Sequence, residues 1–245
     1  MKLTAPIALL PVALLAACGG AGSENGSAPV ASAPVAGKPA PAGKAWVDVV
    51  TATPEGGYRM GNPDAPLKLL EFGSRACPYC AKFSAEGMGP LKSTYIASGK
   101  VSYEFRDYPI HGALDVAPIL LGHCLSADAF FPMLDQMMAN QPTLLAKAEQ
   151  VIPQATALGE PTKVATAFAE ELGYLDFVKQ RGVPEDQARK CLTDKAKIAT
   201  LAANADKANQ QYNVRGTPTF ILNGKVLEDT GDWAKLEPAL KAAGA

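Results

Sequence analysis

The stretch Leu-Lys-Leu-Leu-Glu-Phe-Gly-Ser-Arg-Ala-Cys-Pro-Tyr-Cys, residues 67–80, contains the strongest fold signal in the chain. Residues 67–72 are a largely apolar run bounded by Pro66 and Gly73, which predicts a short strand covered on both faces. Pro78 suits the first turn of a helix, where its missing N–H would have no intrahelical partner. The segment is therefore expected to pass from a buried strand directly into a helix at Cys77.

Cys77 and Cys80 are the candidate reactive groups of this junction. Three positions apart at a helix start, they face the same side and lie close enough to form a disulfide. Unpaired N–H groups and the positive end of the helix dipole stabilise a thiolate at Cys77, which is the expected nucleophile, while Cys80 is the expected resolving thiol. The same spacing is half of a zinc site, but the sequence has no second Cys-x-x-Cys and no His pair to complete one.

The elements after the motif continue an α/β pattern. A helix is predicted over residues 79–98, with a kink or break because Gly87, Gly89 and Pro90 weaken its middle. Residues 101–106 alternate apolar and polar side chains, which predicts a strand.

The carboxyl-terminal part supplies a hairpin and a final helix. Residues 219–222 and 225–228 flank Asn223-Gly224, a dipeptide typical of a two-residue hairpin turn. Asp232 is a good N-cap for a closing amphipathic helix. Residues 110–211 show helical spacing and almost no strand signal, so an inserted helical subdomain is expected there.

The first 44 residues are expected to be a targeting segment and a linker. Residues 1–17 have the charge and apolar run of a signal peptide, and Leu15-Ala16-Ala17-Cys18 resembles the lipobox of bacterial lipoproteins, in which Cys18 is lipidated. The alternative is an ordinary secretory signal with an incidental cysteine. Residues 18–44 are rich in Ala, Gly, Pro and Ser, which predicts a flexible linker before a domain over residues 45–245.

Charge and motifs exclude several function classes. The 23 basic and 24 acidic side chains leave a net charge of -1, whereas a nucleic-acid binder needs a basic excess. The sequence contains no Gly-rich phosphate loop and no serine nucleophile motif, and neither His111 nor His123 has metal-ligand spacing. No cofactor, metal or nucleic-acid partner is therefore expected.

The motifs in combination resemble the DsbA-like thiol:disulfide oxidoreductases of the thioredoxin superfamily. The resemblance covers roughly residues 58–243 and rests on Glu71-Phe72, the Cys77–Cys80 motif, Phe-Arg-Asp-Tyr-Pro at 105–109, a helical insertion and Gly-Thr-Pro-Thr-Phe at 216–220. It implies a thioredoxin fold with an inserted helical subdomain. It also implies that Pro218 is cis beside the cysteine pair and that Thr217 offers its backbone to an extended substrate peptide.

The resemblance further suggests roles around the motif. Glu71, beneath the pair, would exchange a proton with Cys80, the alternative being a carboxylate exposed at a strand end. The best-known enteric members carry His where this chain has Tyr79. Stabilisation of the Cys77 thiolate is therefore expected from the helix dipole and N–H groups.

Two further cysteines remain once Cys77 pairs with Cys80 and Cys18 is lipidated. An exported compartment favours a structural disulfide between Cys124 and Cys191. Three alternatives stay open: two buried free thiols, a second redox pair that relays electrons to the first, and a four-cysteine zinc site.

These features together predict a lipid-anchored periplasmic thiol:disulfide oxidoreductase. We expect it to oxidise unfolded or cysteine-containing exported proteins, with a membrane partner resembling DsbB regenerating its disulfide. A reductase or isomerase of the same fold, fed by a membrane reductant, is the first alternative. The second is a non-catalytic lipoprotein that binds Cu(I) or peptides.

Overall fold

The computed structural model describes residue 1 and residues 32–245. The expected signal peptide, the lipidation site Cys18 and the linker as far as residue 31 lie outside the described residues. Within the described range, no helix has both the length and the apolar character needed to cross a membrane.

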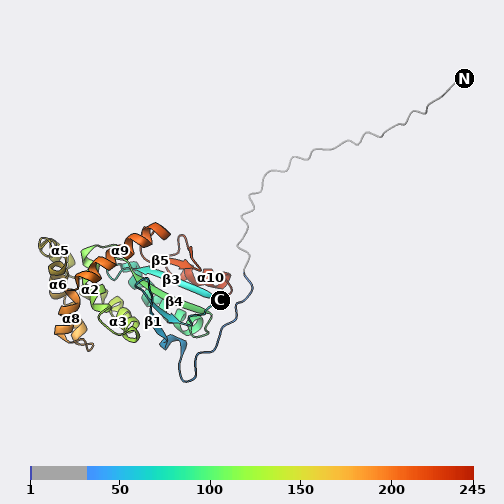
Figure 1. Ribbon diagram of the computed structural model, residues 1–245, viewed down its shortest axis with the longest axis horizontal. Helices are drawn as coiled ribbons and strands as arrows, with labels where there is room; N and C mark the ends of the chain where they lie inside the picture. The colour runs from blue at the N-terminus through green and yellow to red at the C-terminus, as the bar shows by residue number, and fades with distance from the viewer. Residues whose placement is uncertain (2–31) are drawn as a thin grey trace. The chain divides into compact units, whose positions relative to one another are not determined.

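A mixed sheet of six strands, in the order β1-β2-β4-β3-β5-β6, forms the centre of the described domain. Figure 1 labels four of them, β1, β4, β3 and β5. β3 and β4 are parallel, and the other neighbouring pairs are antiparallel. The strands are β1 (Val50–Ala52), β2 (Tyr58–Gly61), β3 (Leu67–Gly73), β4 (Val101–Asp107), β5 (Thr219–Leu222) and β6 (Lys225–Val226).

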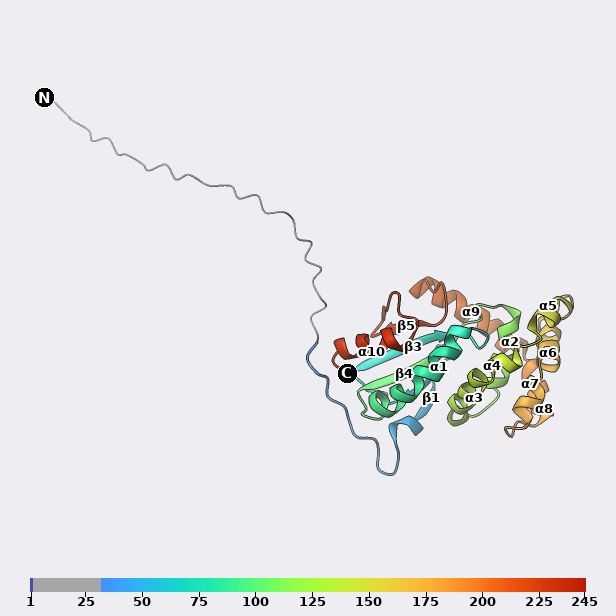
Figure 2. The ribbon, with the colours of Figure 1, turned by 180° about the vertical axis from the view of Figure 1, so that it is seen from behind.

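Helices cover both faces of this sheet and form a separate helical layer at one end (Figures 1 and 2). The helical elements are η1 (Trp46–Asp48), α1 (Pro78–Pro90), η2 (Leu91–Ile96), α2 (Ala113–Gly122), α3 (Ala127–Ala139), α4 (Gln141–Leu144), α5 (Ala148–Thr156), α6 (Pro161–Glu171), α7 (Tyr174–Lys179), α8 (Glu185–Leu192), α9 (Lys195–Tyr212) and α10 (Trp233–Ala242).

The central strand β3 has apolar side chains on both faces, as its composition predicts. Leu69 lies in one core cluster with Phe83 of α1 and Leu236 of α10. Leu70 and Phe72 lie in another cluster, with residues of α9. Because side chains alternate along a strand, position 71 faces the α1 side, which is the side of the cysteine motif.

The region between β4 and β5 is helical, so the predicted thioredoxin fold with an inserted helical subdomain is confirmed. Helices α2 and α5–α8 enclose their own apolar cluster, in which Phe168, Val178 and Leu192 are fully buried. α9 then returns along the sheet and leads into β5. This subdomain has a core of its own and also reaches the cysteine motif.

The predicted break in the helix over 79–98 is confirmed: α1 ends at Pro90, and the chain continues as a π-helical segment, η2, in which Ala97 N–H donates to Lys92 O. Two other local details depart from the sequence-based expectation. β6 is shorter than residues 225–228. β1 and β2 were not predicted, because each is only three or four residues long and is held in the sheet by its pairing partners.

The described part of the expected linker, residues 32–44, also differs from a flexible coil. Ser32 N–H donates to Ala242 O at 2.8 Å and Val35 N–H to Gly244 O at 2.8 Å. Trp46 Nε1 donates to Lys38 O at 2.6 Å. The carbonyls at the end of α10 need partners outside the helix, and this segment supplies them.

Candidate functional site

The Cys-Pro-Tyr-Cys motif lies at the junction of β3 and α1 (Figure 2). Cys77 is the N-cap of α1 and Pro78 its first residue. Cys77 and Cys80 are free thiols that are 4% and 1% exposed, whereas Tyr79 is 68% exposed. The two sulfurs thus form the inner part of the motif, and the ring of Tyr79 projects into solvent.

The two sulfurs have opposite proton affinities. The Cys80 thiol and the N–H groups of Tyr79 and Cys80 donate to the Cys77 sulfur, and they lower its pKa to about 5 although burial acts the other way. Burial, together with the hydrogen bond to Cys77, raises the pKa of Cys80 well above its usual range. At neutral pH this arrangement favours one thiolate and one thiol, as a nucleophile and a resolving group require.

The helical subdomain helps to hold the turn that carries the motif. Gln141 of α4 is buried, and its Nε2 donates to Arg75 O at 2.9 Å and to Cys77 O at 3.0 Å. From the strand side, Ser74 N–H donates to Cys80 Sγ at 3.4 Å. The turn that carries Cys77 and Cys80 is therefore held from both halves of the domain.

Glu71 is buried on the α1 side of β3, at 2% exposure. Burial raises its pKa to about 8, although the Tyr103 hydroxyl, which donates to Oε2 at 2.6 Å, acts in the opposite direction. Glu71, Cys80 and Tyr103 line one narrow cavity beneath α1. A carboxylate exposed at a strand end is therefore ruled out, and at neutral pH Glu71 is largely protonated.

Thr217 and Pro218 lie beside Cys77 and are joined by a cis peptide bond. The Cys77 thiol donates to Thr217 O at 3.1 Å, across 140 positions of sequence. Thr217 Oγ1 is buried without a hydrogen-bond partner among the described residues. When Cys77 is a thiolate, this hydroxyl can donate to it, and Thr217 accordingly contributes to the lowered pKa of Cys77.

Arg75, one of the residues missed by sequence reasoning, is fully buried behind the motif. It donates two hydrogen bonds to Asp107, Nε to Oδ1 at 2.7 Å and Nη2 to Oδ2 at 3.1 Å, and His123 Nε2 lies 2.7 Å from Asp107 Oδ2. Burial alone would raise the pKa of Asp107, but Arg75 and His123 outweigh it and lower the pKa to about 2. A satisfied ion pair of this kind ties the motif to β4 and the end of α2.

A second missed cluster lies beside the start of the motif and involves Ser74, Asp115 and His111. Ser74 Oγ donates to Asp115 Oδ1 at 2.8 Å and lies 3.0 Å from His111 Nδ1. The only sequence signal was the short spacing between His111 and Asp115, and nothing in the sequence placed Ser74 beside them.

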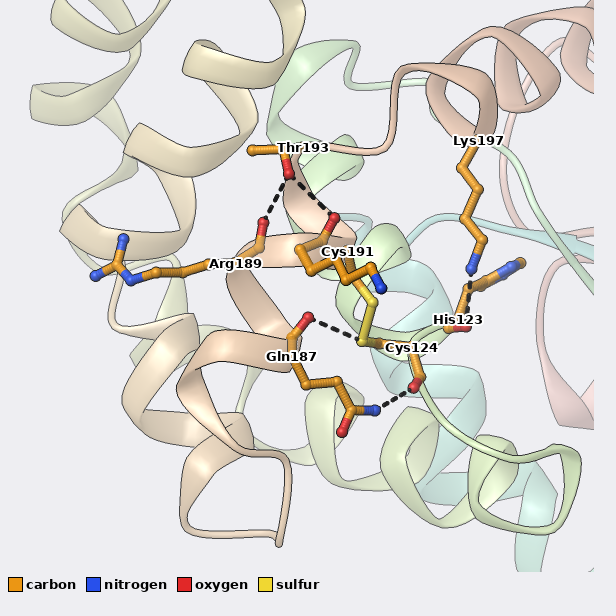
Figure 3. The surroundings of a disulfide bond; sticks show 8 residues. His123, Cys124, Gln187, Arg189, Cys191, Thr193 and Lys197 are labelled. Atoms are coloured by element: carbon orange, nitrogen blue, oxygen red, sulfur yellow. Dashed lines mark hydrogen bonds between the residues drawn. A yellow bond between two sulfur atoms is a disulfide. The ribbon is translucent and has the colours of Figure 1, made fainter.

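The remaining two cysteines form a disulfide between the end of α2 and α8 (Figure 3). Cys124 and Cys191 have Cα atoms 5.9 Å apart. Around them, Gln187 Nε2 donates to Cys124 O at 2.9 Å and Lys197 Nζ donates to His123 O at 3.3 Å. The bond closes a long loop within the helical subdomain. It contributes no sulfur to the Cys77–Cys80 motif.

No group of three His, Cys, Asp or Glu side chains in residues 32–245 is arranged to hold a metal ion. The arrangement at Cys77 is instead that of a thiol exchange centre: one stabilised thiolate, one shielded thiol, a buried acid and an adjacent backbone carbonyl.

The thioredoxin family model matches residues 53–242, which is most of the chain. The chain belongs to the thioredoxin family, in its DsbA-like group. Disulfide bond formation protein D of Bacillus subtilis is 24% identical over 199 residues, which cover 79% of this chain and 81% of that protein. A putative protein-disulfide oxidoreductase of Rickettsia bellii is 25% identical and matches 69% of this chain but 58% of its own length.

A solved structure supports the same assignment. The protein-disulfide isomerase of Novosphingobium aromaticivorans is 32% identical, with a TM-score of 0.72 over 75% of this chain and 95% of that one. The DsbA-like chain described here is thus a thiol:disulfide oxidoreductase.

Proposed function

We propose that this oxidoreductase introduces disulfides into exported proteins, with the Cys77–Cys80 disulfide as oxidant. The observation that carries the proposal is the split between the pKa of Cys77, lowered to about 5, and that of Cys80, raised well above its usual range. A stable Cys77 thiolate favours the reduced form of the pair. Its disulfide is therefore readily reduced, which makes it an oxidant.

The first step of the proposed reaction forms a mixed disulfide. A substrate thiolate attacks Cys77 Sγ, the Cys77–Cys80 bond breaks, and Cys80 leaves with the electron pair. Cys80 then takes a proton, for which Glu71 is the proposed donor because burial raises its pKa and so favours its protonated form, and because it lines the same cavity.

The second step releases the oxidised substrate. A second substrate thiolate attacks the substrate sulfur bound to Cys77, and Cys77 leaves as the stabilised thiolate. The substrate has then lost two electrons and gained a disulfide, and the enzyme pair is reduced. An external oxidant must accept those electrons, and we propose a membrane partner resembling DsbB.

We propose that the substrate peptide binds to the backbone at Thr217 and Pro218. Thr217 O lies 3.1 Å from Cys77 Sγ, so a peptide paired along residue 217 would bring its own cysteine to the nucleophile. Backbone pairing carries little side-chain selectivity, which suits unfolded substrates of varied sequence.

The proposed location is outside the cytoplasm, on a membrane through a lipid on Cys18. The lipobox-like Leu15-Ala16-Ala17-Cys18 supports the lipid, and the Cys124–Cys191 disulfide supports an oxidising compartment. Metabolic labelling with palmitate tests the anchor: wild type should incorporate label and C18S should not. Equal labelling of both would refute the anchor at Cys18.

An isomerase is the second candidate, because the relative at 32% identity is named a protein-disulfide isomerase. The reduction potential of the Cys77–Cys80 pair, measured in glutathione buffers, separates the two. A value near about -120 mV is expected for an oxidant, whereas about -200 mV or lower would indicate an isomerase or reductase. Absence of a reversible two-electron step would reject all of these activities.

A further inference from the structure

Asp115 is a buried carboxylate beside the cysteine motif with no lysine or arginine partner in the described part of the chain. It is 0% exposed and accepts hydrogen bonds from Ser74 Oγ, from Ala76 N–H at 2.9 Å and from His111 N–H at 2.9 Å. A charged carboxylate in such a place calls for a cation nearby.

The side chain of His111 is the cation available to it. His111 Nδ1 lies 3.4 Å from Asp115 Oδ2 and 3.0 Å from Ser74 Oγ, and the side chain is 39% exposed. The hydrogen bond to Asp115, followed by the charges of Asp115 and Cys77, raises the pKa of His111 above its usual value against the effect of burial. Nε2 has no hydrogen-bond partner within residues 32–245.

This cluster is hydrogen-bonded to the turn that carries both sulfurs, because Ser74, whose Oγ lies 3.0 Å from His111 Nδ1, also donates its N–H to Cys80 Sγ at 3.4 Å. Asp115 Oδ1 accepts from the N–H of Ala76, the residue directly before Cys77, while Oδ2 faces His111. The charged groups that act on the imidazole are the Asp115 carboxylate, from α2, and the Cys77 sulfur, from the start of α1. Arg75, two positions before Cys77, is paired with Asp107.

We propose that the His111 imidazolium, held by Asp115 and Ser74, is a positioning residue that stabilises the Cys77 thiolate and makes the redox equilibrium of the pair depend on pH. The inference rests on the proposed function and names the group that tunes it. Sequence reasoning assigned the stabilisation of Cys77 to the helix start alone, whereas the structure adds a side chain from the loop before α2.

The proton balance follows from reduction of the pair. Two electrons break the Cys77–Cys80 bond, Cys80 takes one proton, and Cys77 remains a thiolate. Because the thiolate favours the charged imidazole, the pKa of His111 is higher in the reduced than in the oxidised form. Between those two pKa values, reduction takes up a second proton on His111. There the redox equilibrium constant changes by an additional factor of up to about ten per pH unit, which is about 30 mV.

The test uses H111Q, which keeps a polar group of similar size but removes the charge. Thiolate absorbance near 240 nm, followed against pH, gives the pKa of Cys77, and glutathione buffers at several pH values give the redox equilibrium. We expect the Cys77 pKa in H111Q to rise by about one unit and the reduced form to be disfavoured about tenfold, or about 30 mV. The additional pH dependence should disappear.

Two further variants keep the result interpretable. K82Q also removes one positive charge, but from an exposed position of α1. It should change neither the Cys77 pKa nor the redox equilibrium appreciably. D115N keeps an acceptor for Ala76 N–H, lowers the pKa of His111, and should move the additional pH dependence to lower pH.

An unchanged Cys77 pKa and an unchanged pH profile in folded H111Q would overturn the inference, as would equal shifts in H111Q and K82Q. Neither result would affect the proposed function. That function fails separately, if the wild-type pair has no reversible two-electron step.

Discussion

The two cysteine pairs of the described domain differ in nearly every physical respect. Cys77 and Cys80 lie three positions apart at the start of α1, buried, with hydrogen-bond donors directed at one sulfur. Cys124 and Cys191 lie 67 positions apart in the helical subdomain, are partly exposed, and are already joined. The reactivity of a cysteine in this domain therefore depends on the surroundings of its sulfur. One pair has a stabilised thiolate and a nearby acid, and the other closes a loop.

The largest expected effect is on exchange catalysis by the first pair. C77A removes the nucleophile and should reduce thiol oxidation by on the order of a thousandfold or more. C80A keeps the nucleophile but removes the resolving thiol, so mixed disulfides with substrate should accumulate and be visible by mass spectrometry. Equal activity of the two variants in a substrate-oxidation assay would contradict the assignment of roles.

The next largest effect is expected on the free energy of unfolding when the Cys124–Cys191 disulfide is removed. Replacing both Cys124 and Cys191 with Ser leaves no free thiol behind and releases a loop whose closure stabilises the fold by up to about 4 kcal/mol. Denaturant unfolding should report this loss, while the rate of substrate oxidation stays within about twofold of wild type. A large loss of rate at unchanged stability would instead support an electron relay between the pairs.

A smaller effect is expected from the acid beneath the first pair. E71Q keeps an acceptor for the Tyr103 hydroxyl but has no proton to exchange, so the step in which Cys80 leaves should slow by up to about a hundredfold. Stopped-flow fluorescence of mixed-disulfide formation measures this step. A rate within twofold of wild type would remove Glu71 from the mechanism.

E71Q should also change how the free energy of unfolding depends on pH. The pKa of Glu71 is about 8 in the folded protein, above its value in the unfolded chain, so the folded state binds more protons between those values. Wild-type stability contributed by this group is therefore present at low pH and lost as pH rises toward about 8. Denaturant midpoints across that range should fall less steeply in E71Q than in wild type.

Local sequence patterns predicted most elements near the motif. The β3 strand, the helix that starts at Pro78, the β4 strand, the Asn223-Gly224 hairpin and the closing helix all follow from apolar alternation, turn chemistry and capping, which act over a few neighbouring residues. The short strands β1 and β2 were not predicted, because their pairing partners hold them in the sheet and their own composition does not mark them as strands.

The polar clusters around the motif could not be predicted from local sequence patterns. Ser74 and Asp115 are 41 positions apart, and Gln141 lies 64 positions after Cys77, so no spacing rule connects them. Each is an ordinary polar residue in the sequence. Their importance comes from burial, which makes an unpaired polar group unfavourable and so brings a partner to each one.

The sequence by itself determined the chemistry available to this protein: two cysteines at a helix start, an acid on the preceding strand and a cysteine pair left over for a disulfide. Tertiary structure alone decided the proton affinities of those groups. Burial raises the pKa of Glu71 and Cys80, donors from α1 lower that of Cys77, and the loop after β4 and the first turn of α2 bring His111 and Asp115 to the motif. The physical reason is that the charge of a group depends on which atoms surround it, and folding brings those atoms from distant parts of the chain.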